Sequence, residues 1–352
     1  MAAGRRRPCP REANGRAAHR LDCVTDASVP SGPRVTGAAV TAVDDPFARI
    51  AALPGVPDAV LSARDAVDRL LGHRILRRRG AEVSAESALR GARASAALEG
   101  RPFALGDVRA GAVTDPVLQG ALRVSGELGV LADTWRRAPR QALARLHALA
   151  AADVVDARWL GRPRTADEEA TAAAATDPAA RMDTHTDAAV RGAHSSAGGA
   201  HAAVGDAQSA VSGRQATVDD VLGLGRPPAP GAVAARLDAL FDLLMSDTEA
   251  PAIVVGAIVH GELLALRPFW RCDGIVARAA QRVTFIARGL DPKSLVAPEV
   301  GHADLGGAYA EALHGYVAGT PVGVAGWVRH CADAVSVAAR DSLALCEALH
   351  RG

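Results

Sequence analysis

The stretch from Pro251 to Leu266 constrains the fold most, because nearly all of its residues are apolar, including Ile253, Ile258 and Leu264. An amphipathic surface helix would show a polar stripe, whereas a helix that is hydrophobic on all sides must be buried on all sides. We therefore expect a central helix that is surrounded by other elements. This helix leads directly into the polar segment from Arg267 to Arg278.

Helical spacing of apolar residues recurs along the rest of the chain, and no stretch shows convincing period-two alternation. The sequence therefore predicts an all-α fold, with at most a short β-hairpin near 155–165. The helices that we expect are Val56–Leu76, Ala81–Gly100, Thr114–Trp135, Pro139–Val155, Ala232–Met245, Pro251–Leu266, Gly274–Arg288, Val300–Val317 and Gly323–Leu349.

Two of these helices have informative ends. The basic run 77–79 followed by Gly80 is typical of a helix C-terminus, so we expect the first helix to end there. The helix 81–100 is rich in alanine and serine, which would let it approach a neighbour closely. Glu99 lies in its last turn, where the helix dipole disfavours an acid. That position indicates a specific positive partner, although an ordinary exposed glutamate is the alternative.

Two segments lack large apolar residues and periodicity, which predicts disorder. We divide the chain into a disordered extension (1–45), N-terminal helices (46–164), a low-complexity insertion (165–217) and a helical core (218–352). The insertion contains His185, His194 and His201, whose spacing matches no zinc-ligand pattern. The sequence therefore predicts no metal site.

The composition excludes several classes of protein. The 352 residues are 49% hydrophobic and 22% charged with a formal net charge of +1, which argues against a protein that binds nucleic acid by neutralising phosphates. Five cysteines without a CxxC pair favour a reducing compartment. No apolar run reaches the ~20 residues of a membrane helix. We expect a cytoplasmic protein that binds neither nucleic acid nor membranes.

The segment after the apolar helix places Arg267, Arg271 and Arg278 around the start of the next helix. The free N–H groups and the dipole of a helix N-terminus attract anions, and guanidinium groups bind phosphate well. An anion pocket is one interpretation. The other, which the chemistry alone favours, is that these arginines pair with acids such as Asp273 and Glu99 or face water.

The same segment resembles the signature of the Fic/Doc family, His-Pro-Phe-x-(Asp/Glu)-Gly-Asn-Gly-Arg-x-x-Arg. Pro268, Phe269, Gly274 and Arg278 occupy matching positions. The resemblance extends from about residue 46 to residue 352, apart from the insertion 165–217. It implies a Fic-like helical bundle.

A second motif supports the resemblance. Many Fic proteins carry an inhibitory helix with the pattern (Ser/Thr)-x-x-x-Glu-(Gly/Asn), and Ser95, Glu99 and Gly100 match it. Because the motif precedes the signature, the chain resembles the class with an N-terminal inhibitory helix. The resemblance then implies that Glu99 pairs with Arg278.

The signature also departs from the family at the positions that carry its chemistry. Arg267 stands in place of the histidine base, and a guanidinium remains protonated at working pH. Arg271 replaces the acid that holds Mg²⁺, which argues against magnesium binding. Ile275 replaces one phosphate-binding arginine. His260 lies two helical turns away, about 10 Å along the axis, so we expect it to be structural.

Two further residues change the loop itself, since Cys272 and Asp273 replace a glycine and an asparagine. Asp273 could in principle accept a proton, but its location beside the phosphate site argues against that role. Cys272 could have a covalent role, because a helix N-terminus can lower the pKa of a thiol, but no partner histidine is placed for it and we regard it as incidental. We expect Cys272, Asp273, Gly274 and Arg278 to line the anion site instead.

The sequence therefore predicts a Fic-fold protein with a degenerate signature that is inactive or impaired in AMP transfer. Its role would be to bind a nucleotide or phosphate, or to regulate. The alternatives are an active transferase that moves AMP onto protein hydroxyls, and a helical scaffold, so whether the chain is an enzyme stays open. The resemblance implies ATP as a ligand, a protein target or regulatory partner, and a homodimer.

Overall fold

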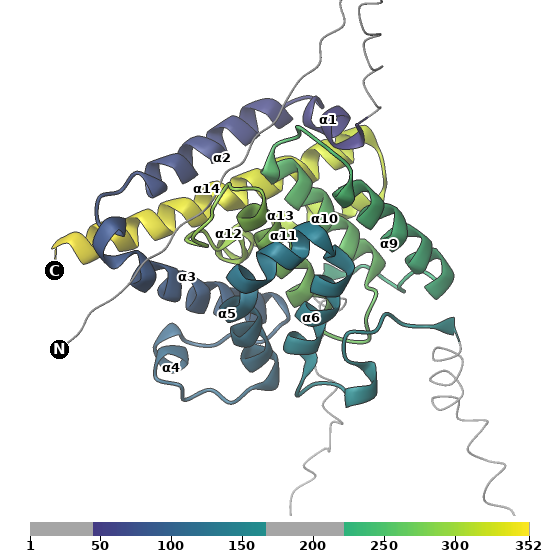
Figure 1. Cartoon of the computed structure of the whole chain (residues 1–352), viewed down its shortest axis with the longest axis horizontal. Helices are drawn as coiled ribbons and strands as arrows, with labels where there is room; N and C mark the ends of the chain where they lie inside the picture. The colour runs from purple at the N-terminus through teal and green to yellow at the C-terminus, as the bar shows by residue number, and fades with distance from the viewer. Residues whose placement is uncertain (1–44, 167–221, 352) are drawn as a thin grey trace, which may run out of the picture. The chain divides into compact units, whose positions relative to one another are not determined.

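The computed structural model describes residues 45–166 and 222–351, and within these ranges the chain is all-α, without a strand (Figure 1). The N-terminal range contains six α-helices and one 3₁₀ helix. They are α1 (Pro46–Ala51), α2 (Val56–Leu71), α3 (Leu76–Leu98), α4 (Leu105–Arg109), α5 (Pro116–Arg137), α6 (Pro139–Ala151) and η1 (Ala157–Trp159).

The C-terminal range contributes the central helix and the longest one. Its helices are α9 (Pro230–Met245), α10 (Ala252–Leu266), α11 (Asp273–Ala287), α12 (Pro298–Asp304), α13 (Gly307–Val317) and α14 (Pro321–Arg351). None of the helices in the two described ranges is both long and apolar enough to cross a membrane.

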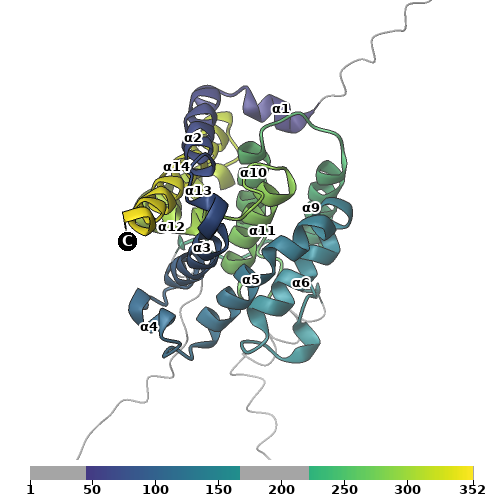
Figure 2. The same cartoon turned by 60° about the vertical axis from the view of Figure 1, so that its left-hand side comes forward.

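Helices α10 and α11 lie side by side in the centre, and the other helices pack around them (Figure 2). On one side α14 runs along both α2 and α10, and on the other α5 and α6 cover α11. Of the residues in α10, only Ala252 and Glu262 are not buried. The expectation of a central apolar helix is therefore confirmed.

Helix α3 packs between α5 and α12 and also contacts α11. Its small residues allow this close approach, as Gly91 shows most clearly. A Cβ atom at Gly91 would lie only 2.7 Å from Nη1 of Arg282 on α11 and 3.1 Å from Cβ of Ala297 beside α12. Both distances are shorter than ordinary van der Waals contacts, so a side chain here would require the buried Arg282 or the neighbouring helices to shift.

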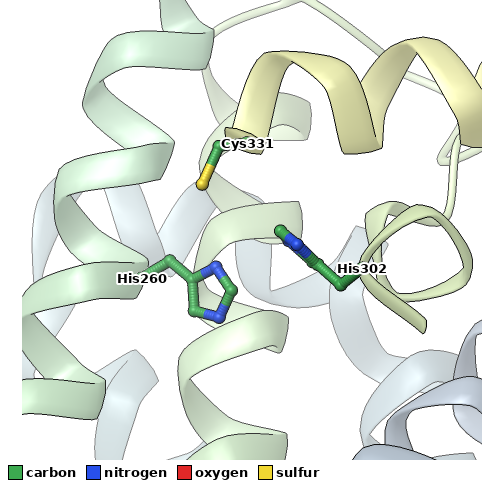
Figure 3. Close-up of side chains that lie close together, drawn as sticks. All are labelled: His260, His302 and Cys331. Atoms are coloured by element: carbon green, nitrogen blue, oxygen red, sulfur yellow. The ribbon is translucent and has the colours of Figure 1, made fainter. Parts of the chain in front are cut away.

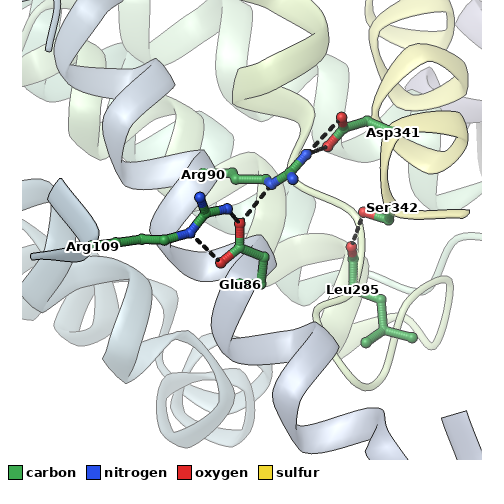
Figure 4. A network of polar contacts seen from close by, with 6 residues as sticks. All are labelled: Glu86, Arg90, Arg109, Leu295, Asp341 and Ser342. Atoms are coloured by element: carbon green, nitrogen blue, oxygen red, sulfur yellow. Dashed lines mark hydrogen bonds and ion pairs between the residues drawn. The ribbon is translucent and has the colours of Figure 1, made fainter. Parts of the chain in front are cut away.

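A polar network fixes α3 against α14 and α4 (Figure 4). Arg90 on α3 donates from Nη1 to both carboxylate oxygens of Asp341 on α14, at 2.8 and 2.9 Å. Glu86, one turn earlier on α3, accepts hydrogen bonds from Arg90 and from Arg109 of α4. Each of these partly exposed pairs is weak. Together they set the register of α3, which matters for the residues at its C-terminal end.

The structure corrects several expected boundaries. The first long helix ends at Leu71, with Gly72 as its C-cap, rather than at Leu76. Residues 76–98 form α3, in which two helical pieces meet at a kink at Arg79 (φ −122°). A break therefore does lie in the basic run, directly before Gly80, but a short helical turn that starts at Leu76 precedes it. The expected helix 300–317 is two helices, because Gly306 with φ +56° breaks it.

The remaining expectations concern the possible hairpin, the short helices and the two segments without periodicity. No hairpin forms at 155–165, where η1 and an extended segment are found instead, and the short helices α1 and α4 were not expected. The predicted extension (1–45) and insertion (165–217) lie, except for residues 45, 165 and 166, outside the described residues. So do His185, His194 and His201.

Candidate anion site at the start of α11

The loop between α10 and α11 is bounded by two residues in the left-handed conformation. Arg267 (φ 44°) ends α10, and Cys272 (φ 64°) is the N-cap residue of α11. Residues other than glycine rarely adopt this conformation, and it costs roughly 1–2 kcal/mol. The loop therefore needs strong compensating contacts, and its own polar groups supply them.

Within the loop, the side chains of Asp273 and Cys272 make structural contacts. Oδ1 of Asp273 accepts the backbone N–H of Phe269 at 2.9 Å, which closes the turn. Sγ of Cys272 donates to the carbonyl of Ala150 on α6 at 3.7 Å. Burial raises the pKa of the Cys272 thiol, so it stays protonated and is a poor nucleophile. Neither side chain is placed to replace a catalytic base.

Arg267 is buried at the same loop. Its Nη1 donates to the carbonyl of Gly225 at 2.7 Å, and its own carbonyl accepts from Nε and Nη2 of Arg164 at 3.1 and 3.0 Å. The backbone N–H of Arg164 also donates to the carbonyl of Pro268 at 2.8 Å. Arg164 therefore lies against the turn formed by Arg267 and Pro268. Its cationic side chain caps the carbonyl at the C-terminal end of α10.

Arg278, one turn into α11, is fully buried and points at the end of α3. Its Nε donates to Oγ of Ser95 at 3.0 Å, and Nη2 donates to the carbonyl of Ser95 at 3.0 Å. Nη2 also donates to Oε1 of Glu99 at 2.6 Å, and the exposed fractions of the two side chains are 0% and 6%. The structure thus brings together Ser95, Glu99 and Arg278.

The positive charge of Arg278 is stabilised by the polar groups around it. Burial alone lowers its pKa, but Tyr309 and Glu99 outweigh that effect and the pKa is raised. The guanidinium is therefore a permanent buried cation that requires a negative partner. In the described structure that partner is Glu99. An anionic ligand at the same place would have to displace it.

Gly100 has a conformational role in this contact. Its φ is +77°, and the N–H of Arg101 donates to the carbonyl of Ala96 at 2.9 Å, which is the pattern of a glycine-terminated helix. Glu99 is the C-cap residue of α3 rather than part of its last turn. The turn at Gly100 ends the helix directly after the carboxylate that contacts Arg278.

Sequence reasoning missed a second buried arginine, Arg282, one turn further along α11. Its Nη2 donates to Oγ of Ser87 on α3 at 3.0 Å, and its Nη1 lies 3.7 Å from Oε2 of Glu299 on α12. The signal was present in the sequence, because Arg278 and Arg282 are four residues apart and share a helix face. Two arginines of α11 thus contact two serines of α3.

His147 on α6 was also missed. Its ring stacks on Phe269 with a centroid distance of 3.9 Å, and its Nδ1 accepts the N–H of Gly161 at 2.9 Å. Burial lowers its pKa to about 4, so the imidazole is neutral at physiological pH. It supports the aromatic residue of the turn.

The remaining expected residues are separate from the Ser95–Glu99–Arg278 contact or lack a polar role. Arg271 is exposed, Ile275 is buried and apolar, and Gly274 lies in the first turn of α11. His260 is fully buried and bonds through Nε2 to the hydroxyl of Tyr309 at 2.9 Å.

Comparisons with known proteins bear on the fold. No model of a protein family matches the chain, and no curated protein sequence does so. Among solved structures, the chain is similar to a Fic family protein from Desulfovibrio desulfuricans G20, with a TM-score of 0.55 and 16% sequence identity. The similarity covers 82% of this chain and 74% of that one. The chain therefore has the fold of a Fic family protein.

Proposed function

We propose that this protein is a Fic-fold binding or regulatory protein whose anion pocket is closed by the Ser95–Glu99 end of α3. The observation that carries the proposal is the buried contact of Arg278 with Ser95 and Glu99, at the N-terminal end of α11. A buried guanidinium beside a helix N-terminus is suited to bind phosphate, and here a carboxylate occupies that role.

The loop supports binding better than turnover. Arg267, which stands where the family's base would be, is protonated and donates to the carbonyl of Gly225. Cys272 and Asp273 hold the loop together. Loss of a general base alone removes about 10²–10⁴-fold of the rate of a proton-transfer step. We therefore propose that AMP transfer is absent or strongly impaired.

The ligand that we propose is ATP or another phosphate compound, bound without a protein-held Mg²⁺. Carboxylate oxygens are the ligands that Mg²⁺ prefers, and the position of the family's acidic ligand carries the exposed Arg271. Any Mg²⁺ would arrive on the nucleotide itself.

Calorimetry with ATP and with inorganic phosphate tests the proposal. The parent should bind weakly or not at all, and Glu99→Gly should bind because the competing carboxylate is gone. Adding Arg278→Ala to Glu99→Gly should abolish that binding. Glu82→Gly is the matched control, since Glu82 is an exposed glutamate of the same helix. Absence of ATP and phosphate binding in Glu99→Gly would overturn the proposal.

A label-transfer assay separates this function from an active transferase. Glu99→Gly is incubated with ATP labelled in the α-phosphate, with the chain itself and a cell extract as acceptors. We expect no labelled protein above the background of Glu99→Gly/Arg278→Ala. Labelling that depends on Arg278 would mean that the protein catalyses AMP transfer, and the proposed binding role would be wrong.

A further inference from the structure

A second buried polar cluster lies where α10, α12 and α14 meet, and the anion site does not use it. Its members are His260, His302 and Cys331, all of which are fully buried (Figure 3). One nitrogen from each imidazole and Sγ of Cys331 lie within 4.8 Å of one another. We propose that these three side chains bind a zinc ion.

The donor set suits zinc. Two imidazoles and one thiolate are borderline-soft ligands, and this combination is found in zinc sites that keep a fourth position for another ligand. Nitrogen and sulfur bind zinc at about 2.0–2.3 Å, so the three ligand atoms would have to draw together by roughly 1 Å.

The hydrogen bonds around the histidines favour the tautomers that a metal needs. Nε2 of His302 lies 3.0 Å from Oε1 of Gln281, and in the tautomer that donates this hydrogen bond the lone pair is on Nδ1. Nε2 of His260 can likewise donate to the hydroxyl of Tyr309. Metal-binding histidines usually donate their second N–H to an oxygen acceptor in this way.

Nδ1 of His260 carries the strongest indication. It is buried, and no hydrogen bond to it is found within residues 45–166 and 222–351. The same nitrogen faces the space between Cys331 and His302 in Figure 3. A bound ion is one of the recognised explanations for a buried polar atom without a partner. A zinc ion would supply the missing partner.

Charges near the cluster must balance when a cation binds. The positive charge of Arg278 acts on His260 and would repel the ion, but Glu99 pairs with Arg278. The Cys331 thiol must lose its proton when the metal binds.

His330 lies beside the cluster. Its Nε2 is within hydrogen-bond distance of Nδ1 of His302, at 3.1 Å, so zinc would replace this contact when it binds. His330 also lines a groove of about 560 Å³ at α13 and α14, together with the carboxylates of Glu311 and Asp333 and the guanidinium of Arg329. His330 thus lies between the groove and the cluster.

Metal content of the full-length, untagged protein tests the site. After incubation with zinc chloride and gel filtration, we expect about one zinc per chain in the parent, and at least a tenfold loss of affinity in Cys331→Ser. Cys346→Ser is the matched control, because Cys346 is another fully buried free cysteine of α14 outside the cluster. Equal zinc binding by Cys331→Ser and the parent would overturn the assignment.

Cobalt substitution tests thiolate ligation in the parent protein itself, and the variants then identify the cysteine. Co²⁺ bound by a thiolate gives a charge-transfer band in the near ultraviolet, which surface histidines alone cannot produce. We expect this band in the parent and in Cys346→Ser, and its loss in Cys331→Ser. A parent that takes up Co²⁺ without the band, or takes up none, contains a metal-free polar cluster and the proposal is wrong.

Discussion

The substitution Glu99→Gln isolates the charge that Glu99 provides to Arg278. A glutamine keeps an oxygen that can accept from Nη2, and Ser95 keeps both of its contacts with the guanidinium. What disappears is the negative charge beside a cation whose exposed fraction is 0%. Removing one partner of a buried ion pair costs about 3–5 kcal/mol, and the surviving Ser95 contacts place the expected loss near ~3 kcal/mol.

Urea unfolding followed by circular dichroism measures this loss as a change in the free energy of unfolding. Glu82→Gln on the same helix is the control, because that glutamate is exposed and its pair with Arg79 contributes little. A second titration in the presence of phosphate tests whether an anion can take over. Phosphate should stabilise Glu99→Gln more than the parent, by RT ln(1 + [L]/Kd).

A loss of unfolding free energy below about 1 kcal/mol in Glu99→Gln would contradict this expectation, because such a loss is comparable with that of one neutral hydrogen bond. Such a result would mean that water reaches Arg278 in solution, and that α3 does not seal it. If phosphate stabilises both proteins equally, the ion pair between Glu99 and Arg278 is still supported. The same result would show that an anion does not compete with Glu99 for Arg278.

Three further predictions concern the surroundings of the site. Gly91→Ala should destabilise the fold by about 1–3 kcal/mol in thermal unfolding, because its Cβ would meet Arg282. In the same assay Gly126→Ala should stabilise the fold by up to ~1 kcal/mol, because Gly126 lies in α5 with open space around it. Arg164→Ala should cost about 2 kcal/mol in urea unfolding because two charged hydrogen bonds to a buried carbonyl are lost. His147 titrates at about 4 when folded and near 6.5 when unfolded, so its contribution is complete above pH 6.5 and is lost as the pH falls towards 4. The parent should therefore lose up to about 1.4 kcal/mol more per pH unit in that window than His147→Gln does, and equal slopes would contradict the buried, neutral ring.

The sequence predicted the central helix and the fold class because both depend on local periodicity. The apolar stretch 252–266 has no polar stripe, and it is the helix that the others surround. Helix ends were less predictable, since the first long helix ends at Leu71, before the basic run, and Gly306 breaks a helix that periodicity alone made continuous. Glycine permits a break but does not require one, and the surrounding packing decides.

The site was predictable where a motif linked distant residues and was missed where only the fold does so. The contact of Glu99 with Arg278 was expected because the two motifs resemble a family in which they pair. Arg164 and His147 come from segments without a motif, and only the folded chain places them at the turn. The cluster of His260 with Cys331 likewise depends on the crossing of two helices.

A buried ion pair is a poor explanation for stability, because an apolar pair of similar volume often serves as well or better. Stability alone therefore does not explain why Glu99 and Arg278 lie between α3 and α11, beside a loop whose other polar groups are engaged. The double variant Glu99→Leu/Arg278→Met tests this directly. We expect its unfolding free energy to match the parent within about 1 kcal/mol. We also expect it to bind no ATP, because Arg278 is gone, whereas Glu99→Gly keeps Arg278 and binds ATP. A double variant several kcal/mol less stable would instead make the pair a structural element and remove the reason to call it a closed pocket.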